Sequence, residues 1–423
     1  MSKILKNKIL GETLHENILA SGLSTYILPK KGFNEKFASL TVNFGSCDLE
    51  FEVDGKCVST PEGIAHFFEH KVFEDEELDY FNEFTKLSGS VNAYTNFNST
   101  VYYFSCTENF EECLKLLFDM VFSLYVTDET IEKEKGIIEQ EISMYGDDPN
   151  WQVYFNMLAG LYEKSPVRND IAGSAESIAK IDLTMLRTIF STFYVPKNMA
   201  LTCSGDFDID KVYEIATEKT KAIKSPNIKR IYPDEPKKAL KTSVKNDMHV
   251  AKPLFCLGFK DNHIMDDVYR LTSTRILLDI LIGGSSETYN KLYNSGLIDD
   301  GFGSDYSLGN CYSTIIFSGA SKDYDAVLKE IMKRIEEMKK SGVDETVFER
   351  IKKKHLGRYL NSFNSVTTPA DMQADFFVKG FNVFDLVDTL KDTTIRHINE
   401  RLMNCFSEDN FCISVITGES SSD

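Results

Sequence analysis

One short stretch decides how the rest of the sequence is interpreted: residues 60–71, Thr60-Pro61-Glu62-Gly63-Ile64-Ala65-His66-Phe67-Phe68-Glu69-His70-Lys71. Thr60 is a suitable N-cap, and Pro61 suits the first position of a helix. A helix that begins there places His66 and His70 one turn apart on one face, close enough to share a metal ion. Glu69 then lies beside that ion, where it can hold the proton of a water molecule without being a ligand.

Two histidines at this spacing also occur by chance, and a histidine on a helix is usually structural. A metal site therefore needs a third ligand, and the segment 128–145 supplies a candidate. Its apolar residues define one helical face: Ile131, Ile137, Ile138, Ile142 and Tyr145. Glu134 and Glu141 fall on that face. The other three glutamates fall outside it: Glu129, Glu132 and Glu139.

Carboxylates on a buried stripe are costly unless they are paired or bound to a metal. A solvated charged face explains the three outer glutamates, but it does not explain Glu134 and Glu141. Two imidazoles, one carboxylate and a water molecule form the four-coordinate set that is expected of a catalytic zinc. The sequence therefore predicts a His2Glu zinc site, with the carboxylate on a second helix.

Composition limits the other possibilities. A chain of 423 residues with 42% hydrophobic residues predicts two to three globular domains. The net charge of -18 argues against nucleic acid as a partner. No apolar run has the length of a signal peptide or a membrane span. The nine cysteines are dispersed and lack CxxC spacing, which predicts reduced thiols in a soluble, reducing compartment, and hence a cytoplasmic location.

The chain divides into two halves that resemble each other. The lysine- and proline-containing stretch 223–245 is predicted to be a linker between an N-terminal zinc-binding half, 1–222, and a C-terminal half, 246–423. Each half has an early strand, at 37–46 and 253–261, and closes on a strand, at 199–205 and 411–418. Duplication of one α+β unit is the simplest explanation.

These features together resemble the insulinase/pitrilysin family of zinc peptidases, whose signature is HxxEH. Residues 134–149 resemble the distal glutamate helix of that family. The match implies that Glu141 is the third zinc ligand and that Glu134 supports catalysis. It also implies an α+β fold of two homologous α/β halves that form a half-clamshell, and a zinc-dependent endopeptidase that hydrolyses peptides or short precursor and leader segments.

Residues 89–95, followed by 100–104, resemble the edge strand beside the metal in this family. There the match implies that Asn92, Ala93 and Tyr94 bind substrate, with Tyr94 near the cleaved bond. An added strand would hold the peptide by main-chain hydrogen bonds. In the proposed reaction, Glu69 takes a proton from the zinc-activated water and later delivers it to the leaving amine.

The resemblance is strongest to the HxxEH-bearing members of small bacterial pairs, and it extends to the catalytic subunit of mitochondrial processing peptidase. The partner in such pairs carries an Arg and a Tyr that help to bind substrate. At the matching positions this chain has Leu292 and Asp299. We therefore expect a heterodimer with a homologous subunit that lacks HxxEH, while a homodimer stays open. The alternatives are a non-catalytic scaffold subunit and a zinc-stabilised binding module.

Other conspicuous residues carry weaker signals. The glycine pair in 281–286 fits no phosphate-binding spacing and resembles a helix of the second repeat. Five further histidines lack ligand spacing and are predicted to be surface or packing residues: His15, His249, His263, His355 and His397. The lysines 352–354 in the helical segment 347–359 are predicted to form a solvated basic face.

Overall fold

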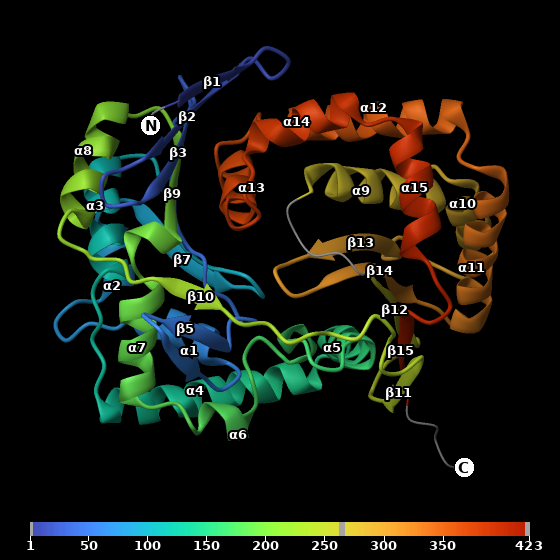
Figure 1. The fold of residues 1–423 in the computed structure, drawn as a ribbon, viewed down its shortest axis with the longest axis horizontal. Helices are drawn as coiled ribbons and strands as arrows, with labels where there is room; N and C mark the ends of the chain where they lie inside the picture. Colours follow the sequence, from blue (N-terminus) through green and yellow to red (C-terminus); the bar gives the residue numbers. More distant parts are fainter. Residues whose placement is uncertain (1–2, 262–266, 419–423) are drawn as a thin grey trace. The chain divides into compact units, whose positions relative to one another are not determined.

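The computed structural model describes residues 3–261 and 267–418, which pack as two compact units (Figure 1). The first unit comprises the described residues up to Ile142 together with Asp170–Tyr232 and Leu360–Phe384. The second unit comprises Ser143–Asn169, Pro233–Tyr359 and the described residues from Asp385 onward. Each unit is built around a sheet of its own, as the predicted α+β fold of two halves requires.

The first unit contains a seven-stranded sheet with the order β1-β2-β3-β9-β4-β8-β7. Alternation along the central strand β4 explains its two faces, because Ala38 and Leu40 point into the main core while Phe37 packs on the opposite face with Tyr103. Strand β7 lies at one edge. The strands are β1 Lys3–Asn7, β2 Glu12–Ile18, β3 Ser24–Pro29, β4 Lys36–Val42, β7 Gly89–Thr95, β8 Thr100–Cys106 and β9 Met199–Gly205.

Helices cover both faces of this sheet. Helix α3 packs against β4, β8 and α8, whereas α13 packs against β4 and β9 on the face that carries Phe37. A smaller sheet has the order β10-β5-β6, from Ile228–Arg230, Glu50–Val53 and Lys56–Ser59. The helices are α1 Ile64–Val72, α2 Tyr80–Lys86, α3 Phe110–Val121, α4 Asp128–Asp147, α6 Ala175–Ile178, α7 Leu183–Phe193, α8 Ile209–Thr220 and α13 Thr367–Val378, with the 3-10 turn η2 Pro196–Asn198.

The second unit repeats the strand order of the first. Its five-stranded sheet runs β11-β15-β12-β14-β13, which matches β3-β9-β4-β8-β7. In both of these five-strand runs the first pair, β3–β9 or β11–β15, is parallel and the following pairs are antiparallel. The predicted duplication is therefore confirmed, as are the four predicted strands. The strands are β11 Ser243–Asp247, β12 Leu254–Lys260, β13 Gly303–Leu308, β14 Ser313–Ala320 and β15 Phe411–Thr417.

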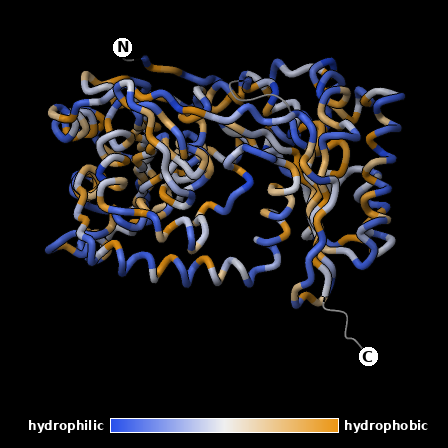
Figure 2. Tube along the Cα trace, turned by 60° about the horizontal axis from the view of Figure 1, so that its bottom comes forward, coloured by the Kyte–Doolittle hydropathy of each residue, from blue (hydrophilic) through white to orange (hydrophobic). Residues whose placement is uncertain are grey.

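The helices of the second unit pack on its sheet and on one another. Helix α5 lies against β12 and β15, and α9 lies against β13 and α15. Figure 2 shows hydrophobic and hydrophilic residues alternating along the helical segments. The helices are α5 Pro149–Leu161, α9 Val268–Ile282, α10 Glu287–Asn294, α11 Tyr324–Ser341, α12 Glu345–Ser362, α14 Val383–Asp392 and α15 Ile395–Cys405, with the 3-10 turn η1 Pro166–Arg168.

The packing differs from a simple division at 223–245. That stretch contains β10, which pairs with β5, and the start of β11, which pairs with β15. Residues 143–169 join the second unit because α5 packs closely on its sheet, where a Cβ added at Gly160 would lie 2.4 Å from Cys412 Sγ. The strand pairings of β10 and β11 and the close approach of Gly160 to Cys412 have no local signal in the sequence.

Two predictions from composition can be compared with the structure. All nine cysteines are free thiols, and all except Cys57 are buried. Among the helices that the structure describes, none combines the length and the apolar character needed to cross a bilayer.

Candidate metal centre

Helix α1 carries the two histidines, but it begins later than predicted. Its N-cap is Gly63, with φ of 85°, and not Thr60. The hydroxyl of Thr60 donates to the carbonyl oxygen of Leu49 at 3.1 Å, so this residue is engaged by the preceding hairpin. A positive φ favours glycine because it carries no Cβ. His66 and His70 nevertheless stay one turn apart, as the spacing predicts.

The apolar side chains of α1 fix its orientation. They lie in the main core of the first unit: Ile64, Ala65, Phe67, Phe68 and Val72. The polar residues of the motif therefore share the remaining side of the helix, where the structure brings them to α4 and β7. Helix α1 is a rigid support for the site because its apolar face is almost fully buried.

Helix α4 presents two of its glutamates to α1, as predicted. Glu134 is buried, and the side chain of Glu141 is 21% exposed. The other three glutamates are exposed: Glu129, Glu132 and Glu139. The prediction that Ile137 belongs to the buried face is wrong, because Ile137 is 45% exposed. The buried stripe is narrower than the apolar pattern predicts, since α4 packs mainly through Ile131, Glu134 and Ile138.

Three side chains converge with the spacing of metal ligands. Nε2 of His66 lies 3.6 Å from Oε1 of Glu141, and Nε2 of His70 lies 3.7 Å from Oε2. Both distances exceed that of a normal hydrogen bond. Ligands held about 2.1 Å from a tetrahedral zinc are about 3.4 Å apart. His66, His70 and Glu141 are also the one such group found among the described residues, and their donor set fits zinc.

Glu134 holds His70 in the orientation that a metal requires. Nδ1 of His70 donates to Oε1 of Glu134 at 2.8 Å, which leaves the lone pair of Nε2 for a metal. Burial alone would raise the pKa of Glu134, but its hydrogen bond with His70 and the charges of His70 and Lys71 outweigh burial and lower that pKa. Burial opposes the charged form of His70 as well, yet the bond and charge of Glu134 raise the pKa of His70.

Lys71 is a part of the centre that the sequence pattern did not indicate. Its side chain is fully buried, its ammonium group contacts the carboxylate of Glu74, and it donates to the carbonyl oxygen of Thr130 at 3.3 Å. A buried lysine is costly unless its charge is compensated. Lys71 therefore joins α1 to the start of α4 and compensates part of the negative charge of the site.

His66 is suited to be a neutral ligand. Its Nδ1 is buried and has no hydrogen-bond partner among the described residues. Burial, together with the neighbouring His70, lowers the pKa of His66 to about 4. A neutral imidazole keeps the lone pair that coordination needs.

Glu69 lies beside the ligand group and is held from β7. Thr95 Oγ1 donates to Glu69 Oε2 at 2.6 Å, and Thr95 Oγ1 in turn lies 3.3 Å from Thr100 Oγ1. The Thr100 hydroxyl donates to the carbonyl oxygen of Phe44 at 3.0 Å. Burial raises the pKa of Glu69, and the hydrogen bond from Thr95 opposes that rise. Thr95 was missed at the sequence level because its contact with α1 depends on the packing of β7.

The three predicted substrate residues lie together on β7, although not on one face. Ala93 packs toward the main core on the α1 side, whereas Tyr94 points to the opposite face, where its hydroxyl donates to Asp371 at 2.9 Å. The main-chain N–H of Ala93 is bound by Oδ1 of Asn92 at 2.8 Å. This N–H is therefore turned away from β8, toward the open edge of the sheet.

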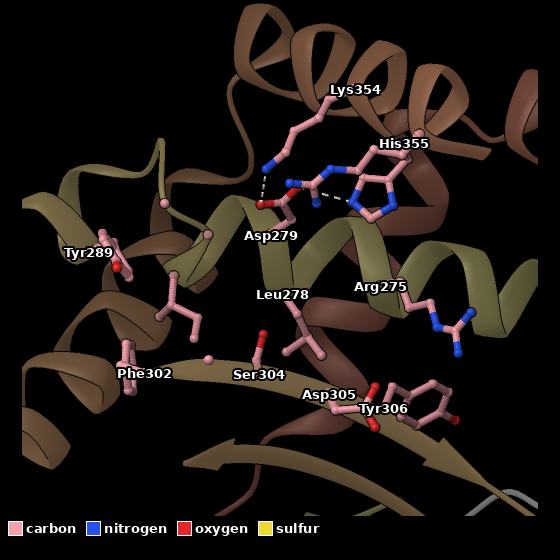
Figure 3. A pocket seen from close by; sticks show the side chains of 15 residues that line it. Arg275, Leu278, Asp279, Tyr289, Phe302, Ser304, Asp305, Tyr306, Lys354 and His355 are labelled. Atoms are coloured by element: carbon pink, nitrogen blue, oxygen red, sulfur yellow. Dashed lines mark hydrogen bonds and ion pairs between the residues drawn. The ribbon is translucent and has the colours of Figure 1, made fainter. Parts of the chain in front are cut away.

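The second unit carries a cavity in place of a metal site. A hollow of about 340 Å³ is lined by α9, β13 and α12, which correspond in chain order to α1, β7 and α4 (Figure 3). Asp279 of α9 is paired with Lys354 Nζ at 2.8 Å and with His355 Nε2 at 3.1 Å. These two partners lower the pKa of Asp279 to about 2, although burial alone would raise it.

The cavity corrects one sequence expectation. Lys354 and His355 are engaged by Asp279, so the lysines of α12 do not all form a solvated face; Lys352 also donates to the carbonyl oxygen of Thr393 at 2.6 Å. Gly283 is the C-cap of α9, which agrees with the prediction that this glycine pair is not a phosphate loop. His263 lies outside the described residues.

Leu292 and Asp299, which the sequence resemblance aligns with an Arg and a Tyr, are both engaged within the second unit. Leu292 is 1% exposed, and Asp299 forms an ion pair with Lys252 at 3.0 Å. Neither side chain can replace the guanidinium or the phenol of the matching residues.

Comparisons with known proteins identify the family of this chain. The family described as Insulinase (Peptidase family M16) matches residues 55–175, and the family described as Peptidase M16 inactive domain matches residues 180–354. An uncharacterized zinc protease of Bacillus subtilis, YmfH, is 34% identical, with 99% of this chain and 100% of the relative covered. The zinc protease PqqE of Helicobacter pylori is 24% identical, with 75% of this chain and 74% of the relative covered.

Solved structures show the same fold. An M16-like peptidase from Alicyclobacillus acidocaldarius has a TM-score of 0.95 and is 33% identical, with 98% of this chain and 100% of that chain covered. A protease from Helicobacter pylori has a TM-score of 0.81 at 21% identity, with 95% of this chain and 98% of that chain covered, and its likeness concerns the fold alone. Because a relative that is 34% identical covers 99% of the chain, this protein belongs to the insulinase family of zinc peptidases, peptidase family M16.

Proposed function

We propose that this chain is a zinc metalloendopeptidase that hydrolyses peptides or short precursor and leader segments. One observation carries the proposal: two imidazole nitrogens and one carboxylate converge at 3.6–3.7 Å, while Glu69 lies beside them and is held by Thr95. A structural zinc site is closed by four protein ligands, whereas a catalytic site keeps a position open for water. The three-ligand group favours catalysis over a zinc-stabilised binding module.

Each residue of the centre has a distinct role in this proposal. His66, His70 and Glu141 hold zinc, and Glu134 orients His70. Bound zinc supplies Lewis acidity, which activates a water molecule and polarises the scissile carbonyl. Glu69 takes the proton of that water at its carboxylate and delivers it to the leaving amine. Thr95 holds Oε2 of Glu69, so the reacting carboxylate keeps one orientation.

We propose that the peptide binds as an added strand along β7. This strand ends the seven-stranded sheet, and its alternate residues Val91, Ala93 and Thr95 direct their main-chain groups to the open edge. Asn92 covers the N–H of Ala93 with its side chain, and a peptide carbonyl would replace it there. Main-chain pairing accepts many sequences, which suits a peptidase of peptides and leader segments.

We further propose that a partner subunit completes the active enzyme. Leu292 and Asp299 stand where the family's single-chain members carry Arg and Tyr, and neither can supply a cation or a phenol. A homologous subunit without HxxEH would provide that pair, and the heterodimer would act in the cytoplasm. A homodimer is the alternative assembly, and a scaffold role without hydrolysis is the alternative function.

The metal assignment is tested by zinc analysis of two matched variants. Glu141→Gln removes a proposed ligand, so zinc should fall from about one per chain to far below that. Glu139→Gln makes the same chemical change on the exposed side of α4 and should keep zinc. Full zinc in the first variant, together with loss in the second, would refute the assignment.

Activity is tested with quenched fluorescent peptides, with the chain alone and with the homologous subunit added. Cleavage that is abolished by a chelator and restored by zinc supports the peptidase. Cleavage only in the mixture supports the partner proposal. A zinc-loaded complex that cleaves no peptide would favour the scaffold role.

A further inference from the structure

The face of β7 opposite the metal centre carries an aromatic ring and a carboxylate in contact. Tyr94 Oη donates to Asp371 Oδ1 at 2.9 Å, although 277 positions separate the two residues in the sequence. Both belong to the first unit, because the segment Leu360–Phe384 packs with it. The ring of Tyr94 also lies 6.2 Å from that of Tyr103, which joins the packing of α13 on this face.

Alternation along a strand determines which substrate side chains meet this pair. Thr95 contacts Glu69 on the α1 side, so Tyr94, its neighbour in the strand, faces the other way. A peptide that adds to β7 has the same alternation. Its side chains on the Tyr94 face lie about 5 Å from the directly opposite residue of β7 and about 7 Å from the diagonal one. The peptide side chains on this face that lie opposite or diagonal to Tyr94 are therefore the ones within reach of Tyr94 and Asp371.

The charge of Asp371 is not matched by a neighbouring cation. Among the described residues, no basic side chain lies within 4.0 Å of Asp371, and its carboxylate accepts a hydrogen bond from the hydroxyl of Tyr94. Asp375, one turn further along α13, differs because Lys379 Nζ contacts both of its carboxylate oxygens, one of them at 2.6 Å. Asp371 is the carboxylate of this pair that remains available to a ligand.

We propose that Tyr94 and Asp371 form a subsite that accepts a basic side chain, Arg or Lys, from the peptide bound along β7. The ring offers its negative face to a cation, and the carboxylate offers an ion pair with the same group. Asp371 is exposed at the surface, yet partial burial of its carboxylate raises its pKa; the hydrogen bond from Tyr94 opposes this rise, and Asp375 adds to it. A cation from the substrate would offset that cost. The subsite rests on the proposed function for the location of the peptide.

The test uses alanine-rich quenched peptides in which one position is Arg, norleucine or Glu, with that position moved along the peptide. For the zinc-loaded enzyme with its partner present, kcat/KM should be about fivefold higher for Arg than for norleucine at one position, which corresponds to about 1 kcal/mol. Asp371→Asn should remove this preference. Asp375→Asn makes the same charge change one turn away, at a carboxylate already paired with Lys379, and should keep it.

Two further variants separate recognition from folding. Tyr94→Phe keeps the ring and should keep most of the preference, whereas Asp371→Lys should reverse it toward Glu. Circular dichroism and the urea midpoint show that each variant is folded. An Arg preference that survives in Asp371→Asn, or that disappears equally in Asp375→Asn, would overturn the subsite. A preference that is absent from the wild-type enzyme at every position would overturn it as well.

The outcome for the subsite is separate from the outcome for the peptidase. If no peptide is cleaved, the proposed function fails, and fluorescein-labelled versions of the same peptides then report binding by anisotropy. Binding about fivefold tighter for the Arg peptide, lost in Asp371→Asn and kept in Asp375→Asn, would support the subsite without catalysis. Equal binding of the Arg and norleucine peptides would refute it.

Discussion

Nδ1 of His70 lies 2.8 Å from Oε1 of Glu134, and this contact determines which nitrogen of His70 faces Glu141. The opposite nitrogen, Nε2, lies 3.7 Å from Oε2 of Glu141. Without the carboxylate of Glu134, the imidazole of His70 could rotate or change its tautomer. Glu134 is not a proposed ligand, but it is therefore as much a part of the metal centre as the proposed ligand Glu141.

Glu134→Gln should weaken zinc binding by about tenfold to a hundredfold, because a neutral amide orients the imidazole less firmly than a carboxylate. Competition with a chromophoric chelator measures the change in affinity. Glu132→Gln is the control, since Glu132 is exposed on the same helix and pairs with Lys135 at 2.7 Å. Equal zinc affinity in Glu134→Gln and the wild type would show that the contact does not orient a ligand.

Thr95→Val should lower kcat about tenfold or more while KM and zinc content change little. Valine has the shape of threonine but lacks the hydroxyl that holds Oε2 of Glu69 at 2.6 Å, and a misplaced general base slows the chemical step. Thr95→Ser keeps the hydroxyl and should restore most of the rate. Steady-state kinetics on one peptide separate kcat from KM. A valine variant with wild-type kcat, or a serine variant as slow as valine, would contradict this role.

Gly63→Ala should destabilise the protein by about 2 kcal/mol or more. Gly63 has φ of 85°, and a Cβ there would lie 2.4 Å from the carbonyl oxygen of Ala172. A left-handed conformation alone costs an alanine about 1–2 kcal/mol. Gly136→Ala is the matched change inside helix α4, where a Cβ meets nothing within 4 Å. That variant should gain about 0.5–1 kcal/mol. Urea unfolding measures both, and equal stabilities would contradict the constraint at the start of α1.

Asp279→Asn should destabilise the second unit at neutral pH and do so less in acid. The pKa of Asp279 is about 2 in the folded protein, below the ordinary 3.8. A carboxyl group whose pKa is lower in the folded than in the unfolded protein stabilises the fold at pH values above its unfolded pKa. That stabilisation is lost as the pH falls through its folded pKa. The variant should therefore cost about 2 kcal/mol at neutral pH and progressively less between about pH 4 and pH 2.

The control for this prediction is Asp305→Asn. Asp305 lines the same cavity, but it is exposed, and no basic side chain among the described residues lies within 4.0 Å of it. Urea unfolding of both variants across this pH range gives the comparison. A cost for Asp279→Asn that does not change with pH would show that its charge contributes nothing.

The features that the sequence predicted are those set by local periodicity. The i, i+4 spacing of His66 and His70 follows from helix geometry alone, and the seven-residue spacing of Glu134 and Glu141 places both on one face of α4. The four strands that open and close the two repeats were identifiable because they are short apolar runs that end at turns. These patterns depend on neighbours within a few residues.

The features that the sequence did not predict depend on tertiary contacts. Nothing near Thr60 indicates that its hydroxyl donates to the carbonyl oxygen of Leu49 or that Gly63 is the N-cap of α1. The apolar pattern predicts that Ile137 is a core residue. It is exposed, because the buried stripe of α4 is narrower than the apolar pattern predicts. The contact of Tyr94 with Asp371 joins two residues that are 277 positions apart in the sequence.

The central claim is that Glu69 acts on the proton of water while His66, His70 and Glu141 hold the metal. It is tested most directly by measuring zinc content and peptide cleavage together in Glu69→Gln. Glutamine has the size of glutamate but cannot accept the proton, so the variant should keep about one zinc per chain and lose cleavage by at least about a hundredfold. Cleavage at the wild-type rate in a variant that retains its zinc would contradict the mechanism, and loss of zinc would show that Glu69 holds the metal instead.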